Sequence, residues 1–197
     1  MLTRSLAVLL LVTNVAFAQT PSFESLNSRR IETNKNGMIV LGSWGVINMA
    51  GGITAYLATS DNNELKYFHG MNAIWGATNT LIALGGYMGA KKEAAQKLSC
   101  GDALHKYEAT KRLYLVNAGL DVLYIGTGVV LDIKAEDMNR PFMWAGFGKS
   151  IAMQGIFLLL FDGTMYTLHQ RQDKKWYKLL QGVCVTGNGI GWRYALN

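Results

Sequence analysis

Residues 107–132 read YEATKRLYLVNAGLDVLYIGTGVVLD and decide the fold. The apolar part, from Leu113 to Leu131, is long enough to cross a bilayer as a helix, because a span needs about 20 residues at roughly 1.5 Å of rise per residue. Asp121 lies inside this run. A carboxylate in hydrocarbon costs at least ~2.5 kcal/mol, so we expect Asp121 to face other helices or a water-filled cavity. The segment therefore predicts a bundle of membrane-spanning helices.

The composition agrees with this interpretation. Of the 197 residues, 50% are hydrophobic and 16% are charged, which is too apolar for a disordered chain. The 22 glycines, set against two prolines, favour closely packed helices. The net charge of +6 comes from basic residues that flank the apolar runs, where membrane lipid accounts for them. We therefore expect contact with lipid and no nucleic-acid partner.

Three further apolar runs have spanning length: residues 37–58, 69–89 and 142–168. The second is the weakest by hydropathy, because it contains Asn72 and Asn79. A soluble bundle with unusually buried helices is the alternative, but four such runs favour a membrane. The predicted fold class is an all-α membrane protein, with four transmembrane helices in a domain over residues 37–168.

The two ends of the chain have patterns of their own. Residues 1–18 combine Arg4, an apolar core and the small residues of Ala16-Phe17-Ala18, which is the pattern of a secretory signal peptide. Residues 19–36 are predicted to form a polar tail or surface helix. In the basic C-terminal tail, residues 169–197, Gly187-Asn188-Gly189 is typical of a tight turn. This turn predicts a small C-terminal β-hairpin, with strands at 179–186 and 190–196.

The connection from Lys91 to Arg112 differs from the other two. It is longer, and its alanines, leucines and mixed charges predict a surface amphipathic segment that is broken near Ser99–Asp102.

Polar residues occur at similar depth in all four spans. Counting inward from the ends places Asn48, Asn79, Asp121 and Gln154 near the middle, with Lys149 about one helical turn from Asp121. A Lys149–Asp121 ion pair would offset the cost of burying either charge. One interpretation is that this cluster binds a small polar ligand, an ion or a proton. The other, which we favour, is that it locks the bundle through hydrogen bonds between helices.

Other kinds of chemistry are not indicated. Asp132 and Asp162 are weaker site candidates, because each is placed near a helix end that water reaches. The three histidines, His69, His105 and His169, do not share a helix at metal-ligand spacing, so we expect no metal. Since no catalytic or nucleotide-binding motif is recognisable either, we expect no cofactor and no enzymatic activity.

Two rules disagree about orientation. The mature N-terminus, the Lys91 to Arg112 connection and the C-terminal tail share one face, which carries 14 Lys and Arg residues against three on the other. This bias places the face in the cytoplasm, whereas a cleaved signal peptide places it outside. Cys100 and Cys184 lie on the same face and could pair there in an oxidising compartment. We favour the signal peptide because it is a contiguous pattern.

The run Tyr107-Glu108-Ala109-Thr110-Lys111-Arg112, followed by Asn117-Ala118-Gly119-Leu120-Asp121 and Tyr124, resembles a family of small bacterial membrane proteins without an assigned function. The resemblance extends over most of the chain after the signal peptide. It implies four helices behind that peptide and no particular activity.

The expected function is therefore non-enzymatic. The sequence predicts a structural or partner-binding component of the bacterial inner membrane, whose glycine-rich helix faces could associate with a second copy or with other membrane proteins. The alternative is a small carrier or channel that uses the polar cluster to pass a polar solute, an ion or a proton.

Overall fold

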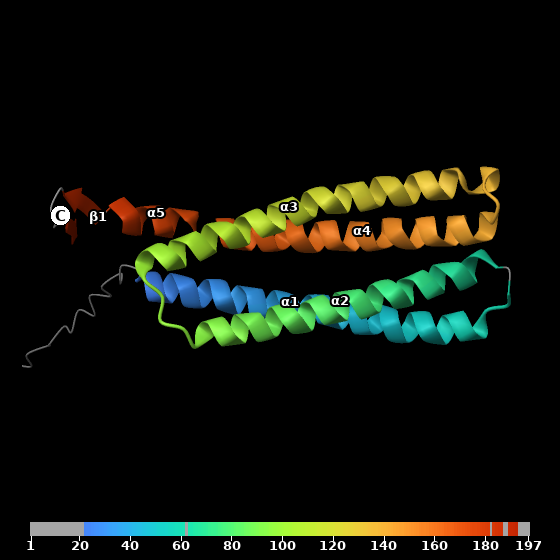
Figure 1. Ribbon diagram of the computed structural model, residues 1–197, viewed down its shortest axis with the longest axis horizontal. Coiled ribbons are helices and arrows are strands. Elements are labelled where there is room, and N and C mark those ends of the chain that lie inside the picture. Colours follow the sequence, from blue (N-terminus) through green and yellow to red (C-terminus); the bar gives the residue numbers. More distant parts are fainter. Residues whose placement is uncertain (1–21, 62, 182, 187–188, 193–197) are drawn as a thin grey trace, which may run out of the picture.

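The computed structural model describes residues 22–61, 63–181, 183–186 and 189–192. Four long helices make up most of it: α1 (Phe23–Ala58), α2 (Glu64–Ala94), α3 (Cys100–Ile133) and α4 (Pro141–Gln170). Helix α1 lies beside α2 and α3 lies beside α4, so two antiparallel helical hairpins form the bundle (Figure 1). The shorter elements are η1 (Ala135–Asp137), α5 (Asp173–Gln181), β1 (Val183–Thr186) and β2 (Gly189–Trp192).

Local sequence sets where the helices begin. The side chains of Ser22, Asn63 and Ser99 each accept a hydrogen bond from a backbone N–H in the first turn of α1, α2 and α3, respectively. Such caps satisfy N–H groups that have no partner within the helix. Helix α4 begins with Pro141, whose missing N–H costs nothing at the first helical position.

Glycines let the two helices of each hairpin touch. A Cβ placed on Gly76 of α2 would lie 2.6 Å from the carbonyl oxygen of Gly45 on α1. A Cβ on Gly128 of α3 would lie 2.5 Å from both the carbonyl oxygen of Gly148 and the backbone nitrogen of Ala152 on α4. Any larger residue at these positions would separate the backbones. These contacts therefore fix the register within each hairpin.

The outer surface of the bundle is apolar. Large aliphatic side chains are exposed on every long helix, among them Ile47, Leu81, Leu123 and Leu160. Soluble proteins rarely expose continuous apolar surface on this scale. Three helical segments, Phe23–Ala58, Cys100–Ile133 and Pro141–Gln181, are long and apolar enough to cross a membrane. Their length and composition are those of a membrane protein.

Helix α2 falls outside this group of three, although it has 31 residues and lies beside α1. The polar residues that lower its hydropathy, Asn72 and Asn79, are buried between helices, whereas Leu81 and Ile82 are exposed. An average over the sequence does not separate the inner face of a helix from its outer face.

A second, smaller core lies at the end of the bundle where α1 begins. It contains Leu26, Ala103, Tyr107, Trp176 and Leu179. Helix α5 contributes Trp176, which stacks on Tyr107 with 5.2 Å between the ring centroids. Burial of this amphipathic helix fixes the chain after α4 against the start of α3.

Beside this core, Arg30 is buried and joins three helices. Its guanidinium donates to Asn27 on α1, to Thr110 on α3 at 3.2 Å and to Glu93 on α2 at 2.5 Å. Lys106 lies 2.8 Å from the same Glu93 carboxylate. Burial alone would raise the pKa of Glu93, but hydrogen bonds from Lys106 and Arg30 hold that pKa below its ordinary value. Arg30, Glu93 and Lys106 therefore form a charged network at the end of the apolar region.

The predicted fold class is wrong at three points. Among the described residues, three helices, not four, have the hydropathy of a span. The predicted surface amphipathic segment does not exist as a separate element, because α2 continues to Ala94 and α3 begins at Cys100. The charged residues before and after this short break belong to α2 and α3. One of them, Glu93 of α2, forms an ion pair with Arg30 of α1.

The third correction concerns the C-terminal β-hairpin. Leu179, predicted to open its first strand, lies in α5 and is buried there, so a hairpin over residues 179–196 is not present and the packed fold is helical. Periodic burial of Trp176 and Leu179 favours a helix over a strand at this point. Beyond α5, the described residues pair only over Val183–Thr186 and Gly189–Trp192, a shorter stretch than the one predicted.

Residues 1–18, predicted to be a signal peptide, lie outside the described residues. The predicted polar tail or surface helix at residues 19–36 is helical from Phe23 onward. It continues without a break into the first apolar run, so both form α1.

Two neighbouring glycines test the close contact between α3 and α4. Gly128→Ala should lower the free energy of unfolding by about 1–3 kcal/mol, because the new methyl group meets the α4 backbone. Gly126→Ala should leave stability unchanged or raise it by up to about 1 kcal/mol, because its Cβ would enter open space and alanine favours the helix. Circular dichroism of the detergent-solubilised variants during unfolding measures both. Equal effects of the two changes would contradict this packing.

Candidate functional site

A hydrogen-bond network centred on Gln154 fills the middle of the bundle. The Gln154 Oε1 accepts from the indole N–H of Trp44 at 2.9 Å and from the amide of Asn79 at 3.4 Å. Its Nε2 donates to Asn48 at 3.0 Å and to Asn72 at 3.1 Å. The network therefore links α1, α2 and α4 through one side chain.

This network uses the full hydrogen-bonding capacity of the Gln154 amide, which has two acceptor sites and two donors. Gln154 is 0% exposed, and Ser150, one turn away on α4, donates to Asn72 at 2.7 Å. No polar atom of the Gln154 amide is left over for a ligand. The arrangement is that of a structural lock between helices.

The structure brings together three of the five residues predicted to form one cluster: Asn48, Asn79 and Gln154. Sequence reasoning missed Trp44, Asn72 and Ser150. Helical spacing could have found two of them, since Trp44 precedes Asn48 by four residues and Ser150 precedes Gln154 by four.

Lys149 is not part of this cluster. Its ammonium group lies 2.5 Å from Glu64 and 3.6 Å from Asp132, at the end of the bundle where α2 begins, and its side chain is 47% exposed. The predicted ion pair with Asp121 does not form. Counting residues inward from the span ends predicted the wrong depth for Lys149. The contact of Gly128 with Gly148 aligns Lys149 with the C-terminal end of α3.

Asp121 instead lies against Asp162. The two carboxyl groups, from α3 and α4, lie beside each other, and Asp162 also lies beside Asn117. The exposed fractions of Asp121 and Asp162 are 3% and 4%. Two carboxylates buried side by side repel each other when both are ionised, which favours a proton on one of them. Asp162 had been placed near a helix end that water reaches, and this prediction is wrong.

One oxygen of the pair has no partner. The Oδ2 atom of Asp121 is buried and makes no hydrogen bond with the described residues. A buried polar atom without a partner costs about 1–3 kcal/mol. The contrast with Gln154 is clear, since there every polar atom of the amide is satisfied.

The carboxyl pair lines a cavity of about 300 Å³ between the two helical hairpins. Its lining comes from all four long helices, chiefly α2 and α3: Met38, Leu41, Trp75, Asn79, Ile82, Gly86, Leu113, Tyr114, Asn117, Leu120, Asp121, Tyr124, Leu158, Phe161 and Asp162. Trp75 of α2 and Tyr124 of α3 meet edge to face across it, with 5.3 Å between their ring centroids. Ile82, Leu113 and Leu120 are exposed, so the cavity opens on the apolar outer surface.

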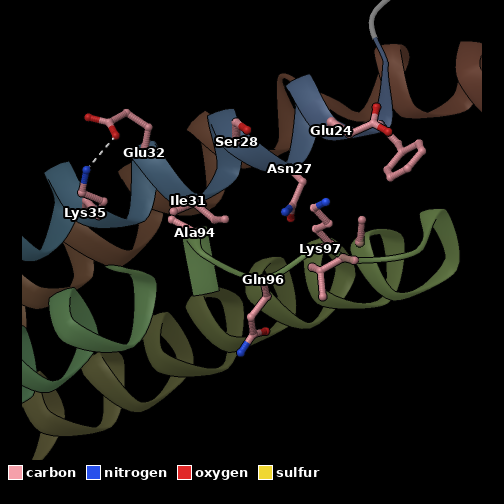
Figure 2. Close-up of a pocket in the computed structure, with 12 residues that line it drawn as sticks. Glu24, Asn27, Ser28, Ile31, Glu32, Lys35, Ala94, Gln96 and Lys97 are labelled. Carbon is pink, nitrogen blue, oxygen red and sulfur yellow. Dashed lines mark hydrogen bonds and ion pairs between the residues drawn. The ribbon is translucent and has the colours of Figure 1, made fainter. Parts of the chain in front are cut away.

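A larger cavity, of about 610 Å³, lies between the first turns of α1 and the segment that joins α2 to α3 (Figure 2). Two of its four charged lining residues, Lys35 and Glu32, pair with each other at 3.0 Å. Asn27, which faces this cavity, accepts hydrogen bonds from Arg30. With no buried polar atom unpartnered among its described lining residues, this cavity is the weaker candidate for binding a specific ligand.

Two further sequence predictions concern metal ligands and a disulfide. The described residues contain no group of three or more His, Cys, Asp or Glu side chains that could hold a metal ion. His169 is buried, and its Nε2 lies 2.9 Å from Asn34 Oδ1. The predicted Cys100–Cys184 disulfide stays a prediction, because the side chain of Cys184 lies outside the described residues.

The saturated network predicts that Gln154 is needed for stability. Gln154→Leu should lower the free energy of unfolding by about 1–3 kcal/mol, because it leaves buried donors and acceptors on three helices unpaired. Met165→Leu, three turns away on α4, is the control that changes buried packing outside the network. Unfolding in detergent measures both, and a Gln154→Leu protein as stable as the wild type would contradict the lock.

Comparison with known proteins adds a family and no activity. Residues 40–163 match a family of unknown function, DUF6992, and this range holds both the Gln154 network and the Asp121–Asp162 pair. The expectation of a family without an assigned function is thereby confirmed. No curated protein and no solved structure matches the chain. Because the match covers well over half of its length, the chain belongs to the DUF6992 family.

Proposed function

We propose that this protein is a non-enzymatic, multi-pass membrane protein that binds a small polar solute or cation at the Asp121–Asp162 pair. Of the two functions expected from the sequence, this favours the carrier or channel over the purely structural component. The Gln154 network keeps the structural role that we favoured for the whole cluster. The site and the lock are thus two separate groups of residues.

The observation that carries the proposal is the pairing of the two acids. Asp121 and Asp162 are the sole Asp, Glu, Lys or Arg residues in the stretches 37–58, 69–89, 113–131 and 150–168. They lie 41 positions apart in sequence, yet they lie side by side on the wall of one cavity. Ionisable residues inside an apolar bundle are costly, and they commonly mark a binding site or an ion pathway.

A purely structural role accounts less well for this pair. Two asparagines could hold α3 to α4 by hydrogen bonds without the cost of burying a charge. A structural role would also leave no reason for two acids to line an open cavity. With one shared proton the pair has a net charge of about −1, which attracts a single cation or a hydrogen-bond donor.

The proposed location is the inner membrane of a bacterium. It is supported by the signal-peptide pattern of residues 1–18 and by the apolar outer surface. Localisation of a tagged full-length chain by membrane fractionation is the corresponding test.

A second candidate function is association with another copy or another membrane protein. Gly85 and Gly89 of α2 have no atom within 4 Å of the position of an added Cβ, so this small-residue face is not used inside the bundle. Gly85→Leu should therefore reduce self-association of the purified protein, seen by light scattering in detergent, without lowering its stability. An unchanged molar mass would remove the support for this candidate.

Carbodiimide labelling tests the proposed site. N,N′-Dicyclohexylcarbodiimide reacts with protonated carboxyl groups in apolar surroundings, and the cavity opens on the apolar surface. We expect one adduct per chain at Asp121 or Asp162, mapped by peptide mass spectrometry. The Asp121→Asn, Asp162→Asn double variant should lose the adduct, whereas Asp132→Asn should keep it.

Labelling of other carboxyl groups alone, with Asp121 and Asp162 unmodified in folded protein, would show that the pair is closed off. The structural role would then be the better description of all the buried polar residues.

A further inference from the structure

We propose that the cavity beside Asp121 and Asp162 binds an organic ammonium ion that carries at least one N–H, with its charged nitrogen at the carboxyl pair and its apolar part between the aromatic side chains. This inference rests on the proposed function, because it names the ligand class of the same site.

The charge around the cavity supports a cationic ligand. Its lining contains two acids and no Lys, Arg or His. None of the ion pairs among the described residues involves Asp121 or Asp162; Lys111 lies 2.7 Å from Asp173 and Lys149 lies 2.5 Å from Glu64. The described chain thus supplies no counter-ion of its own to the pair, and a ligand can supply one.

The carboxyl groups at the cavity wall further narrow the ligand class. Asp121 and Asp162 both line the cavity, and carboxyl oxygens accept hydrogen bonds. A protonated amine provides both a positive charge and an N–H donor, in the charge-assisted geometry that makes such bonds strong. A quaternary ammonium ion provides the charge alone. Primary, secondary and tertiary amines therefore fit better than quaternary ones.

The aromatic side chains support an organic cation over an inorganic one. Trp75 and Tyr124 meet at 5.3 Å on one side of the cavity, and Tyr114 and Phe161 meet at 6.3 Å on another. Aromatic faces attract ammonium groups and pack against their apolar substituents. They cannot replace the water shell of a small metal cation, which requires several oxygen ligands.

The size and position of the cavity agree with this ligand. A volume of about 300 Å³ lies at the lower end of the range for small-molecule pockets. The exposed residues at its edge, Ile82, Leu113 and Leu120, are all aliphatic. An amine with an apolar body can therefore reach the carboxyl pair from the lipid side.

The test measures how far defined probes protect the carboxyl pair of the full-length protein, in phosphatidylcholine nanodiscs, from carbodiimide labelling. The probe is protonated N,N-dimethylbenzylamine, and isobutylbenzene is its neutral isostere. We expect saturable protection by the amine and at least ~10-fold weaker protection by isobutylbenzene. Benzyltrimethylammonium, which lacks the N–H, should protect at concentrations between those required of the amine and those required of isobutylbenzene.

Variants of the aromatic wall supply an independent measurement. Trp75→Leu should weaken protection by the amine about 5- to 10-fold, because it removes a cation–π partner and keeps an apolar side chain. Trp144→Leu is the matched control, because Trp144 packs against Phe147 and does not line the cavity. If Trp75→Leu does not fold, Tyr124→Leu serves the same purpose, with Tyr124→Phe retaining the ring.

The possible failures are distinguishable. Equal protection by the amine and by isobutylbenzene, or by sodium chloride at matched concentration, would overturn the ammonium assignment in favour of an apolar or an inorganic ligand. Labelling of the pair that no amine affects would overturn this inference and leave the proposed function in place. If Asp121 and Asp162 are not labelled at all, both proposals fail.

Discussion

Gln154 holds α1, α2 and α4 together through one amide. Inside an apolar bundle there is little water to satisfy a polar group, so each donor and acceptor must find its partner on another helix or remain costly. The Gln154 side chain meets this constraint completely, with contacts to Trp44, Asn48, Asn72 and Asn79. The α1–α2 hairpin is thereby joined to α4.

The same constraint explains why Asp121 stands apart. Charged groups at both ends of the bundle find partners, with Arg30 bound to Glu93 at one end and Lys149 bound to Glu64 at the other. In the apolar middle, Asp121 lies beside Asp162, another acceptor, and its Oδ2 accepts no hydrogen bond from the described residues. A fold that satisfies Gln154 so fully and leaves Asp121 incomplete separates residues that hold the structure from residues with capacity to bind.

The sequence predicted the helical class, the apolar runs and the mid-bundle position of Asn48, Asn79 and Gln154. These succeed because length, hydropathy and helical rise are local properties. The partner of Asp121 was not predictable in this way, since the register of α3 on α4 depends on backbone contacts at Gly128 and Gly148. Helix α5 was missed because the short apolar stretch around Leu179 fits a strand as well as a helix, and its burial on Tyr107 decides between them.

The arrangement of contacts also orders the events of assembly. Within each hairpin, short turns join the helices, and the glycine contacts form between neighbouring elements, so closing either hairpin costs little chain entropy. The hydrogen bonds of Gln154 join residues 75 to 110 positions apart and need both hairpins in place. Two-helix units should therefore appear first as the chain enters the membrane, and the amide network should close last. A chain interrupted after α2 would contain a finished hairpin whose asparagines still lack their glutamine.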